Sequence, residues 1–175
     1  MSYYSDKIIE IKQKLLVKRN VPVYEPEKWE INGTPIFTNC YAYCLNLDVA
    51  DPQTSIFIPG SISDEYASKN ILSIDTLISN IHKDLNFLGI SYRANAGLLQ
   101  SGEYRIGIFT GYIYPNQPIN VHFVRQDADG KWSEKFGWDG SILREVDFVS
   151  KEPQTSGLAR CNFLIGSLIL KLPTF

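Results

Sequence analysis

The chain has 175 residues, of which 44% are hydrophobic, 13% aromatic and 21% charged. This length and composition predict one packed domain over residues 1–175 and exclude a disordered chain. The formal net charge of -2 leaves no basic excess to neutralise a phosphate backbone. Nucleic acid is therefore not an expected partner.

Residues 1–6 contain no cationic run before an apolar stretch, and no segment has the roughly 18 apolar residues that span a bilayer. We therefore expect no membrane span, no signal peptide and synthesis as a soluble, cytoplasmic protein. Export by a route that reads no cleavable signal is compatible with the same sequence.

Two segments have the apolar periodicity of amphipathic helices. Residues 5–18 predict an opening helix, and residues 75–88 predict a second one that Gly89 ends. Residues 20–36 contain three prolines and an Asn-Gly turn signal, which predict extended and looping chain. Residues 1–38 are thus expected to form an N-terminal helix and an extended lead-in to Cys40.

A short helix is predicted to begin at Cys40. Residues 39–47 lack glycine and proline, and Thr38 and Asn39 can both cap a helix N-terminus.

The second half of the chain is rich in strand-forming residues. The tight turn at residues 127–130 predicts a hairpin that carries His122 on its first arm. Helices precede strands, so the fold class is α+β with an antiparallel sheet. The expected strands are residues 104–114, 119–125, 131–136 and 162–172.

The three cysteines are too few for a disulfide framework. Cys40 and Cys44 would lie one turn apart on a helix face, which is poor geometry for a disulfide, so reduced thiols are expected. Cys44, one turn beyond the helix start, and Cys161, before the last strand, are interpreted as buried packing residues.

Only His82 and His122 could serve in imidazole chemistry. His82 lies at the border of the apolar face of residues 75–88, which indicates a surface or packing role. His122 lies between Val121 and Phe123 in an alternating strand, where Thr, Tyr or Val is more usual.

Cys40 and His122 together predict a nucleophile and its base. A thiol attacks as the thiolate, which the partial positive charge of a helix N-terminus and a nearby imidazole both favour. Glu134 on the returning hairpin arm is the best acceptor to orient the imidazole, with Asp139 and Asn120 as alternatives. The face of Glu134 depends on whether Gly130 forms a bulge.

The oxyanion of an attacked carbonyl needs donors near the helix start. The backbone amide of Cys40 is the natural donor, and Asn39 could assist it.

Four blocks resemble a largely uncharacterised bacterial and phage-associated family whose members look like papain-fold cysteine peptidases or amidases. The block at residues 121–133 is the most specific of the four. The resemblance implies a papain-like fold, with Cys40 as nucleophile and His122 as base. Where the family pattern has Trp-Ser-His-Lys, this chain has Trp132-Ser133-Glu134-Lys135, so glutamate would replace histidine as the orienting residue. The blocks are residues 39–43, 58–60, 107–109 and 121–133.

The predicted function is cleavage of an amide bond through an acyl-thioenzyme, without a cofactor. The substrate would be a peptide or protein, with a peptidoglycan peptide among the compatible ones. A deamidase or acyltransferase would use the same two residues. The sequence does not indicate an oligomeric state.

Two other classes use the same residues. Cys40, Cys44, His122 and Cys161 have ligand types suited to zinc. Alternatively, the scaffold is an inactive binding module that presents aromatic residues such as Tyr112 and Tyr114.

Overall fold

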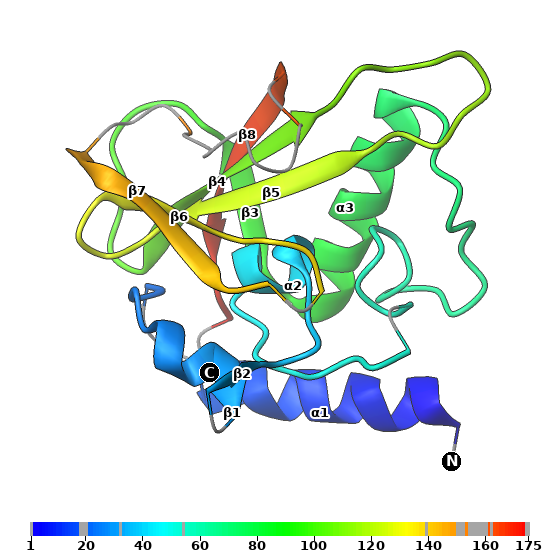
Figure 1. The fold of residues 1–175 in the computed structure, drawn as a ribbon, viewed down its shortest axis with the longest axis horizontal. Helices are drawn as coiled ribbons and strands as arrows, with labels where there is room; N and C mark the ends of the chain where they lie inside the picture. Colours follow the sequence, from blue (N-terminus) through cyan, green and yellow to red (C-terminus); the bar gives the residue numbers. More distant parts are fainter. Residues whose placement is uncertain are drawn as a thin grey trace.

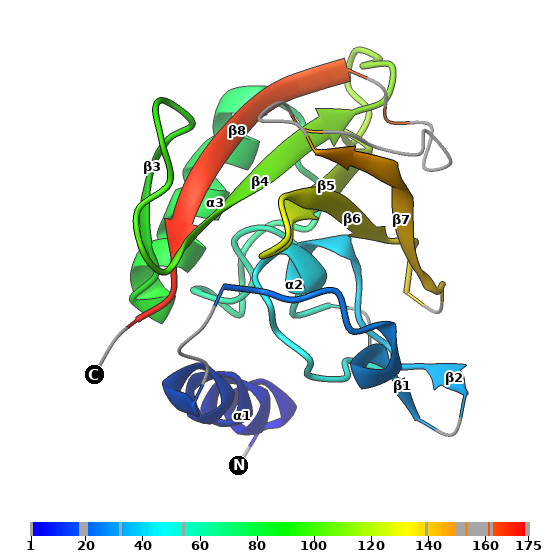
Figure 2. The same ribbon diagram turned by 90° about the vertical axis from the view of Figure 1, so that its left-hand side faces the viewer.

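The computed structural model describes residues 2–17, 21–31, 33–53, 55–138, 140–149, 153, 161 and 163–173, with the backbone alone at 31, 35 and 145–149. The fold is mixed α and β, with an antiparallel open sheet and a few helices. Figures 1 and 2 show α2 between the sheet and α1, with α3 alongside. The predicted α+β class with an antiparallel sheet is confirmed.

The helices are α1 (Tyr3–Val17), α2 (Cys40–Cys44) and α3 (Ile74–Leu88). The two long helices lie where the periodicity predicted them. The Ser73 side chain caps α3 by accepting from the Thr76 backbone N–H, and Gly89 ends α3 in the left-handed conformation. α2 begins at the predicted residue but ends at Cys44, three residues before the predicted end.

Six strands form the main sheet in the order β3-β8-β4-β5-β6-β7, and every neighbouring pair is antiparallel. β8 lies between β3 and β4, in the interior position that its apolar sequence predicted; residue 162, where the prediction began, is outside the described residues. The strands are β3 (Ser91–Ala94), β4 (Glu103–Thr110), β5 (Val121–Gln126), β6 (Lys131–Lys135), β7 (Ile142–Val149) and β8 (Phe163–Lys171).

The predicted strands differ from the structure at β3, β4 and β7. β4 ends at Thr110 instead of residue 114; Gly111 is buried, and residues 112–118 are exposed. β3 and β7 were not predicted. β3 is a four-residue edge strand with partly exposed side chains, and it exists because Ser91 to Ala94 pair with the distant β8.

The lead-in to α2 was predicted as extended and looping, which is wrong for residues 26–29, where a 3-10 helix, η1 (Pro26–Trp29), forms. The extended strands β1 (Glu30–Ile31) and β2 (Thr34–Pro35), with the turn between them, agree with the prediction. Gly33, at positive φ, lies in the turn between the two strands. Trp29 is buried and packs edge-on against Tyr43 of α2, which fixes this segment to the site helix.

The main core lies between the helices and one face of the sheet. α1 contributes Ile11 and Leu15, α3 contributes Leu77 and Ile81, and the sheet contributes residues such as Phe123. No helix among the described residues is long and apolar enough to cross a bilayer.

Candidate active site

Cys40 is the first residue of α2, and its position is fixed by the residue before it. The Asn39 side chain accepts a hydrogen bond from the Ala42 backbone N–H at 3.0 Å, which caps the helix. Its Nδ2 donates to the Phe57 carbonyl at 2.9 Å, so the cap also ties α2 to the neighbouring loop. Of the two predicted capping residues, Asn39 is the one that caps.

The other residues of α2 are buried, whereas Cys40 is half-buried. Tyr41 packs on Phe123 of β5 with ring centroids 4.8 Å apart. The Cys44 thiol is buried and donates to the Tyr41 carbonyl, and burial raises its pKa well above the ordinary value. Cys40 is therefore the thiol of α2 that a substrate could reach.

His122 brings Cys40 and Glu134 together. Its ring is 2% exposed, and its Nε2 is hydrogen-bonded to Glu134 Oε2. The Cys40 side chain lies close enough to the same imidazole to raise its pKa. Because Nε2 is engaged by Glu134, Nδ1 is the nitrogen left to face the sulfur. The structure thus places three of the predicted site residues in one chain of contacts.

The turn between β5 and β6 decides which face Glu134 occupies. Gln126 pairs with Trp132 and Val124 pairs with Glu134, while Gly130 lies in the turn with φ 82°. Cross-strand partners point to the same face and residues two apart share a face, so Glu134 lies diagonally from His122 on the same side. A turn one residue shorter would put Glu134 on the opposite face.

The environment of His122 favours its charged form. Burial alone lowers the imidazole pKa, but hydrogen bonds and charge interactions with Cys40 and Glu134 more than offset that effect. Together they raise the pKa of His122 to about 9. The ring is therefore an imidazolium at neutral pH, with Glu134 as its buried counter-ion.

Arg125 holds α2 against β5 from the far end of the helix. Its guanidinium is buried, lies 3.8 Å from the Tyr43 ring centroid and donates to the Tyr43 carbonyl at 3.1 Å. Its Nε donates to Asp127 Oδ1 at 3.0 Å, which balances the buried charge. Through this contact β5 fixes the C-terminal end of α2, whereas Asn39 fixes its start.

Among the described residues, no hydrogen bond joins the imidazole to Asn120, one of the two alternative orienting residues. Asn120 is exposed, and its backbone carbonyl accepts from Gly111 N and Cys161 Sγ. Asp139 lies outside the described residues. Cys161 is buried, and its pKa is raised to about 11 by burial and by the neighbouring Cys40.

A cavity of about 150 Å³ opens beside Cys40. We call it the Cys40 cavity. Its walls come from the start of α2, the loop before α3 and the start of β5, and they are mostly apolar, as in many ligand sites. It is lined by Asn39, Cys40, Tyr41, Phe57, Ile58, Pro59, Lys69, Ile71, Ile119, Val121 and Phe123.

The wall at residues 58–60 is held by α3. Asn80 donates to the Pro59 carbonyl at 3.1 Å, and the buried Asp84 accepts from the Gly60 backbone N–H at 2.7 Å. A Cβ on Gly60 would lie 2.8 Å from Asn80 Cγ, so this position has room for glycine alone. The Ile58-Pro59-Gly60 block of the sequence is thus a cavity wall.

Sequence reasoning missed several residues of the site, including Lys69, Asn80 and Asp84. Asp84 and Asn80 lie in a helix whose apolar periodicity identified its buried face but not the loop that it holds. Lys69 lies in a polar loop, and nothing local separates it from a surface lysine. It is the one charged residue in the lining of the Cys40 cavity.

The remaining candidates are distributed over the fold. No group of three or more His, Cys, Asp or Glu side chains among the described residues is arranged to hold a metal ion. Cys40, Cys44, His122 and Cys161 are all described, so they do not form the zinc site that their residue types suggested. His82 stacks on Tyr92 with centroids 4.6 Å apart, and Tyr112 and Tyr114 are exposed.

Comparison of the chain with protein-family models, with curated proteins and with solved structures finds no match.

Proposed function

We propose that the protein is a cysteine-dependent hydrolase of the papain-like type that cleaves an amide bond in a peptide or protein. The observation that carries the proposal is the chain of contacts from Cys40 through His122 to Glu134, with only the sulfur end open to a cavity. A nucleophile at a helix start, a base on a strand and a polar residue behind the base form the general arrangement for acyl transfer through a thioester.

Because His122 is an imidazolium at neutral pH, the Cys40 thiol proton has already passed to the ring before the substrate binds, and the sulfur attacks the carbonyl carbon as the thiolate. Glu134 stabilises the imidazolium and fixes the ring orientation, because it accepts from Nε2. The imidazolium then donates its proton to the leaving amine, which departs as the tetrahedral intermediate collapses to a thioester.

The negative oxygen of the intermediate needs donors at the start of α2. The backbone N–H of Cys40 supplies one, because first-turn amides have no acceptor within the helix. Asn39 Nδ2 uses one N–H for the Phe57 carbonyl, and no partner for its second N–H is found among the described residues. That second N–H is the other donor in this proposal.

Water completes the cycle. His122 removes a proton from a water molecule that attacks the thioester carbonyl, and the acid product leaves as the Cys40 thiolate is restored beside the imidazolium. An amine acceptor in place of water would make the same site an acyltransferase, and a side-chain amide substrate would make it a deamidase.

Labelling with iodoacetamide tests the nucleophile. In the intact protein, the residue modified at about pH 6 should be Cys40, with a rate constant at least ~10-fold above that of free cysteine. The variants Cys44→Ala and Cys161→Ala should keep this rate, whereas His122→Ala should lose the enhancement. Modification of every thiol only above about pH 8 would contradict the proposal.

Turnover is tested with a mixture of peptides analysed by mass spectrometry. The wild-type protein and Cys44→Ala should generate new termini that Cys40→Ala and His122→Ala do not. An equal loss of turnover in Cys44→Ala would mean that the nucleophile has been assigned to the wrong sulfur.

A further inference from the structure

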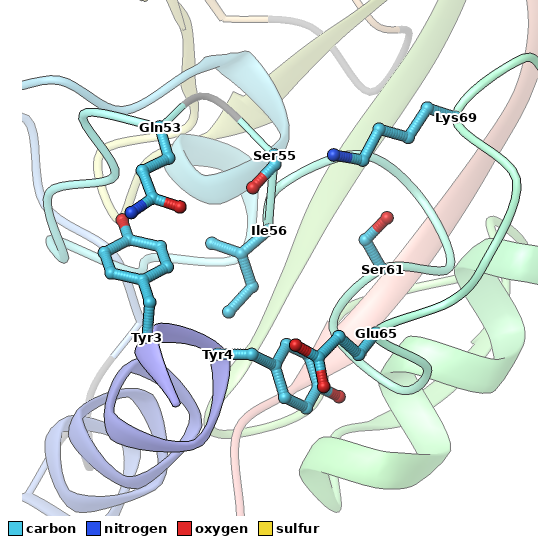
Figure 3. A pocket seen from close by; sticks show the side chains of 8 residues that line it. All are labelled: Tyr3, Tyr4, Gln53, Ser55, Ile56, Ser61, Glu65 and Lys69. Atoms are coloured by element: carbon cyan, nitrogen blue, oxygen red, sulfur yellow. The ribbon is translucent and has the colours of Figure 1, made fainter. Parts of the chain in front are cut away.

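The Cys40 cavity adjoins a second cavity of about 210 Å³, which we call the Ser61 cavity (Figure 3). The same loop forms a wall of both. Residues 57–59 line the Cys40 cavity, whereas Ser55, Ile56 and Ser61 line the Ser61 cavity. Lys69 lines both, so its side chain lies where the two spaces meet.

The Ser61 cavity contains a buried hydroxyl group without a partner. Ser61 is 4% exposed, and its Oγ has no hydrogen bond among the described residues. Of the other hydroxyl groups in the lining, that of Tyr3 donates to Asp51 and that of Tyr4 donates to the Ile62 carbonyl at 2.9 Å, whereas no hydrogen bond of the Ser55 hydroxyl is found among the described residues. A buried polar atom without a partner is unusual in a folded protein, which indicates a ligand contact.

The charges in the Ser61 cavity are separated. Figure 3 shows the Ser61 hydroxyl on the same side as the Lys69 ammonium group, whereas the Glu65 carboxylate lies beside Tyr4. No ion pair of Lys69 is found among the described residues. The end nearest to Cys40 is therefore positive and carries a hydrogen-bond donor, which suits a carboxylate.

We propose that the two cavities form one substrate site, in which Lys69 and Ser61 bind a carboxylate of the substrate while the scissile amide lies at Cys40. This inference rests on the proposed function and adds a substrate class, namely peptides or N-acyl amino acids with a carboxylate close to the cleaved bond. The apolar lining of the Cys40 cavity, with residues such as Phe57 and Ile71, would hold an apolar group next to that bond.

Matched alkylating probes test the proposal without knowledge of the substrate. N-iodoacetyl derivatives of glycine, β-alanine and 4-aminobutyrate differ in reach, and each can be made as the free acid and as the primary amide. At one chain length the acid should alkylate Cys40 ~10-fold faster than the amide, because a charge-assisted contact of about 1.4 kcal/mol gives that factor. Lys69→Met should remove this preference, which is read as the ratio of the acid rate to the amide rate within each variant. Lys83→Met, which removes an exposed lysine of α3, is the matched control.

Ser61→Ala separates binding from folding. The alanine variant should react more slowly with the preferred acid, yet its melting temperature should stay the same or rise, because an unpaired buried hydroxyl group is removed. A fall in melting temperature with no change in the acid rate would contradict a binding role for Ser61. An acid-to-amide ratio that is equal in the wild type and Lys69→Met would overturn the inference while the proposed function stands.

A binding measurement tests the carboxylate site even if the Cys40 thiol is unreactive. The N-acetyl acids and amides of the same series can be titrated into Cys40→Ser by calorimetry, which requires no reaction at the sulfur. Preferential binding of the acids that is lost in Cys40→Ser/Lys69→Met supports the carboxylate site, even if iodoacetamide labelling has refuted the hydrolase. Equal or absent binding of acids and amides overturns the carboxylate site.

Discussion

The imidazole of His122 and the carboxylate of Glu134 meet on one face of the sheet, although they lie on different strands and are not directly opposite each other. Both side chains are almost completely buried. A buried carboxylate beside a buried imidazole stabilises the charged form of the ring, and most of the chemistry proposed for Cys40 depends on this pair.

Replacement of Glu134 should change the titration of His122. Glu134→Gln keeps the side-chain shape but removes the carboxylate that, together with Cys40, raises the pKa of His122 to about 9. The pKa should therefore fall, which NMR titration of the imidazole C–H signals can measure. The signals of His82 provide an internal reference in the same spectra. If the His122 midpoint is the same in both proteins, Glu134 is not the group that sets it.

The folded protein should lose stability as the pH rises through the titration of His122. The folded pKa of about 9 lies above the unfolded value of about 6.5, so the contribution is complete below pH 6.5 and is lost as the pH rises through 9. The free energy of unfolding of the wild type, taken relative to that of His122→Gln, should be lower at about pH 9.5 than at about pH 6 by on the order of 3 kcal/mol. Urea unfolding of both proteins measures this difference, since the other titrating groups are common to both. A difference that does not change with pH would show that His122 titrates alike in both states.

Replacement of the turn glycine, Gly130, should destabilise the fold by an amount that depends on the residue introduced. Gly130 has φ 82°, a region that L-residues other than Asn and Asp rarely enter. Gly130→Ala should destabilise the fold by about 1–2 kcal/mol, and Gly130→Asn should cost less. Any shift of register would also separate Glu134 from His122, so iodoacetamide labelling of Cys40 at about pH 6 should slow in the alanine variant. Equal melting temperatures for the two variants would argue against the left-handed turn.

Replacement of Gly60, at the wall of the Cys40 cavity, should cost more stability than replacement of Gly89, at the end of α3. Gly60 and Gly89 both have positive φ, but an added Cβ meets Asn80 at 2.8 Å at Gly60 and nothing within 4 Å at Gly89. Gly89→Ala should therefore cost about 1 kcal/mol, and Gly60→Ala should cost more, because a clash is added to the backbone strain. Thermal unfolding of the two variants gives the comparison, and similar losses would mean that Asn80 moves away freely.

Interactions between residues close together in the sequence determined part of this structure. The start of α2 at Cys40, the Ser73 cap and the Gly89 end of α3 depend on residues within one helical turn, and sequence patterns predicted the first and the last of these. The burial of Cys44 was predicted from an interaction of the same short range, because the electrostatic field at a helix start has largely decayed one turn further along the helix, where Cys44 lies. The strand position of His122 was also predicted from its neighbours.

Tertiary structure decided the rest. β3 forms because Ser91 pairs with Lys171, and no local pattern contains that partner. The face of Glu134 depends on one residue in the turn at Gly130, since side chains alternate and a shift of one position reverses them. The position of Lys69 between two cavities depends on how α3 holds the loop at Gly60. Local propensity fixes where the long helices form, but short edge strands, the register of strands and the path of a loop depend on contacts between residues far apart in the sequence. These contacts bring Cys40, His122 and Glu134 together.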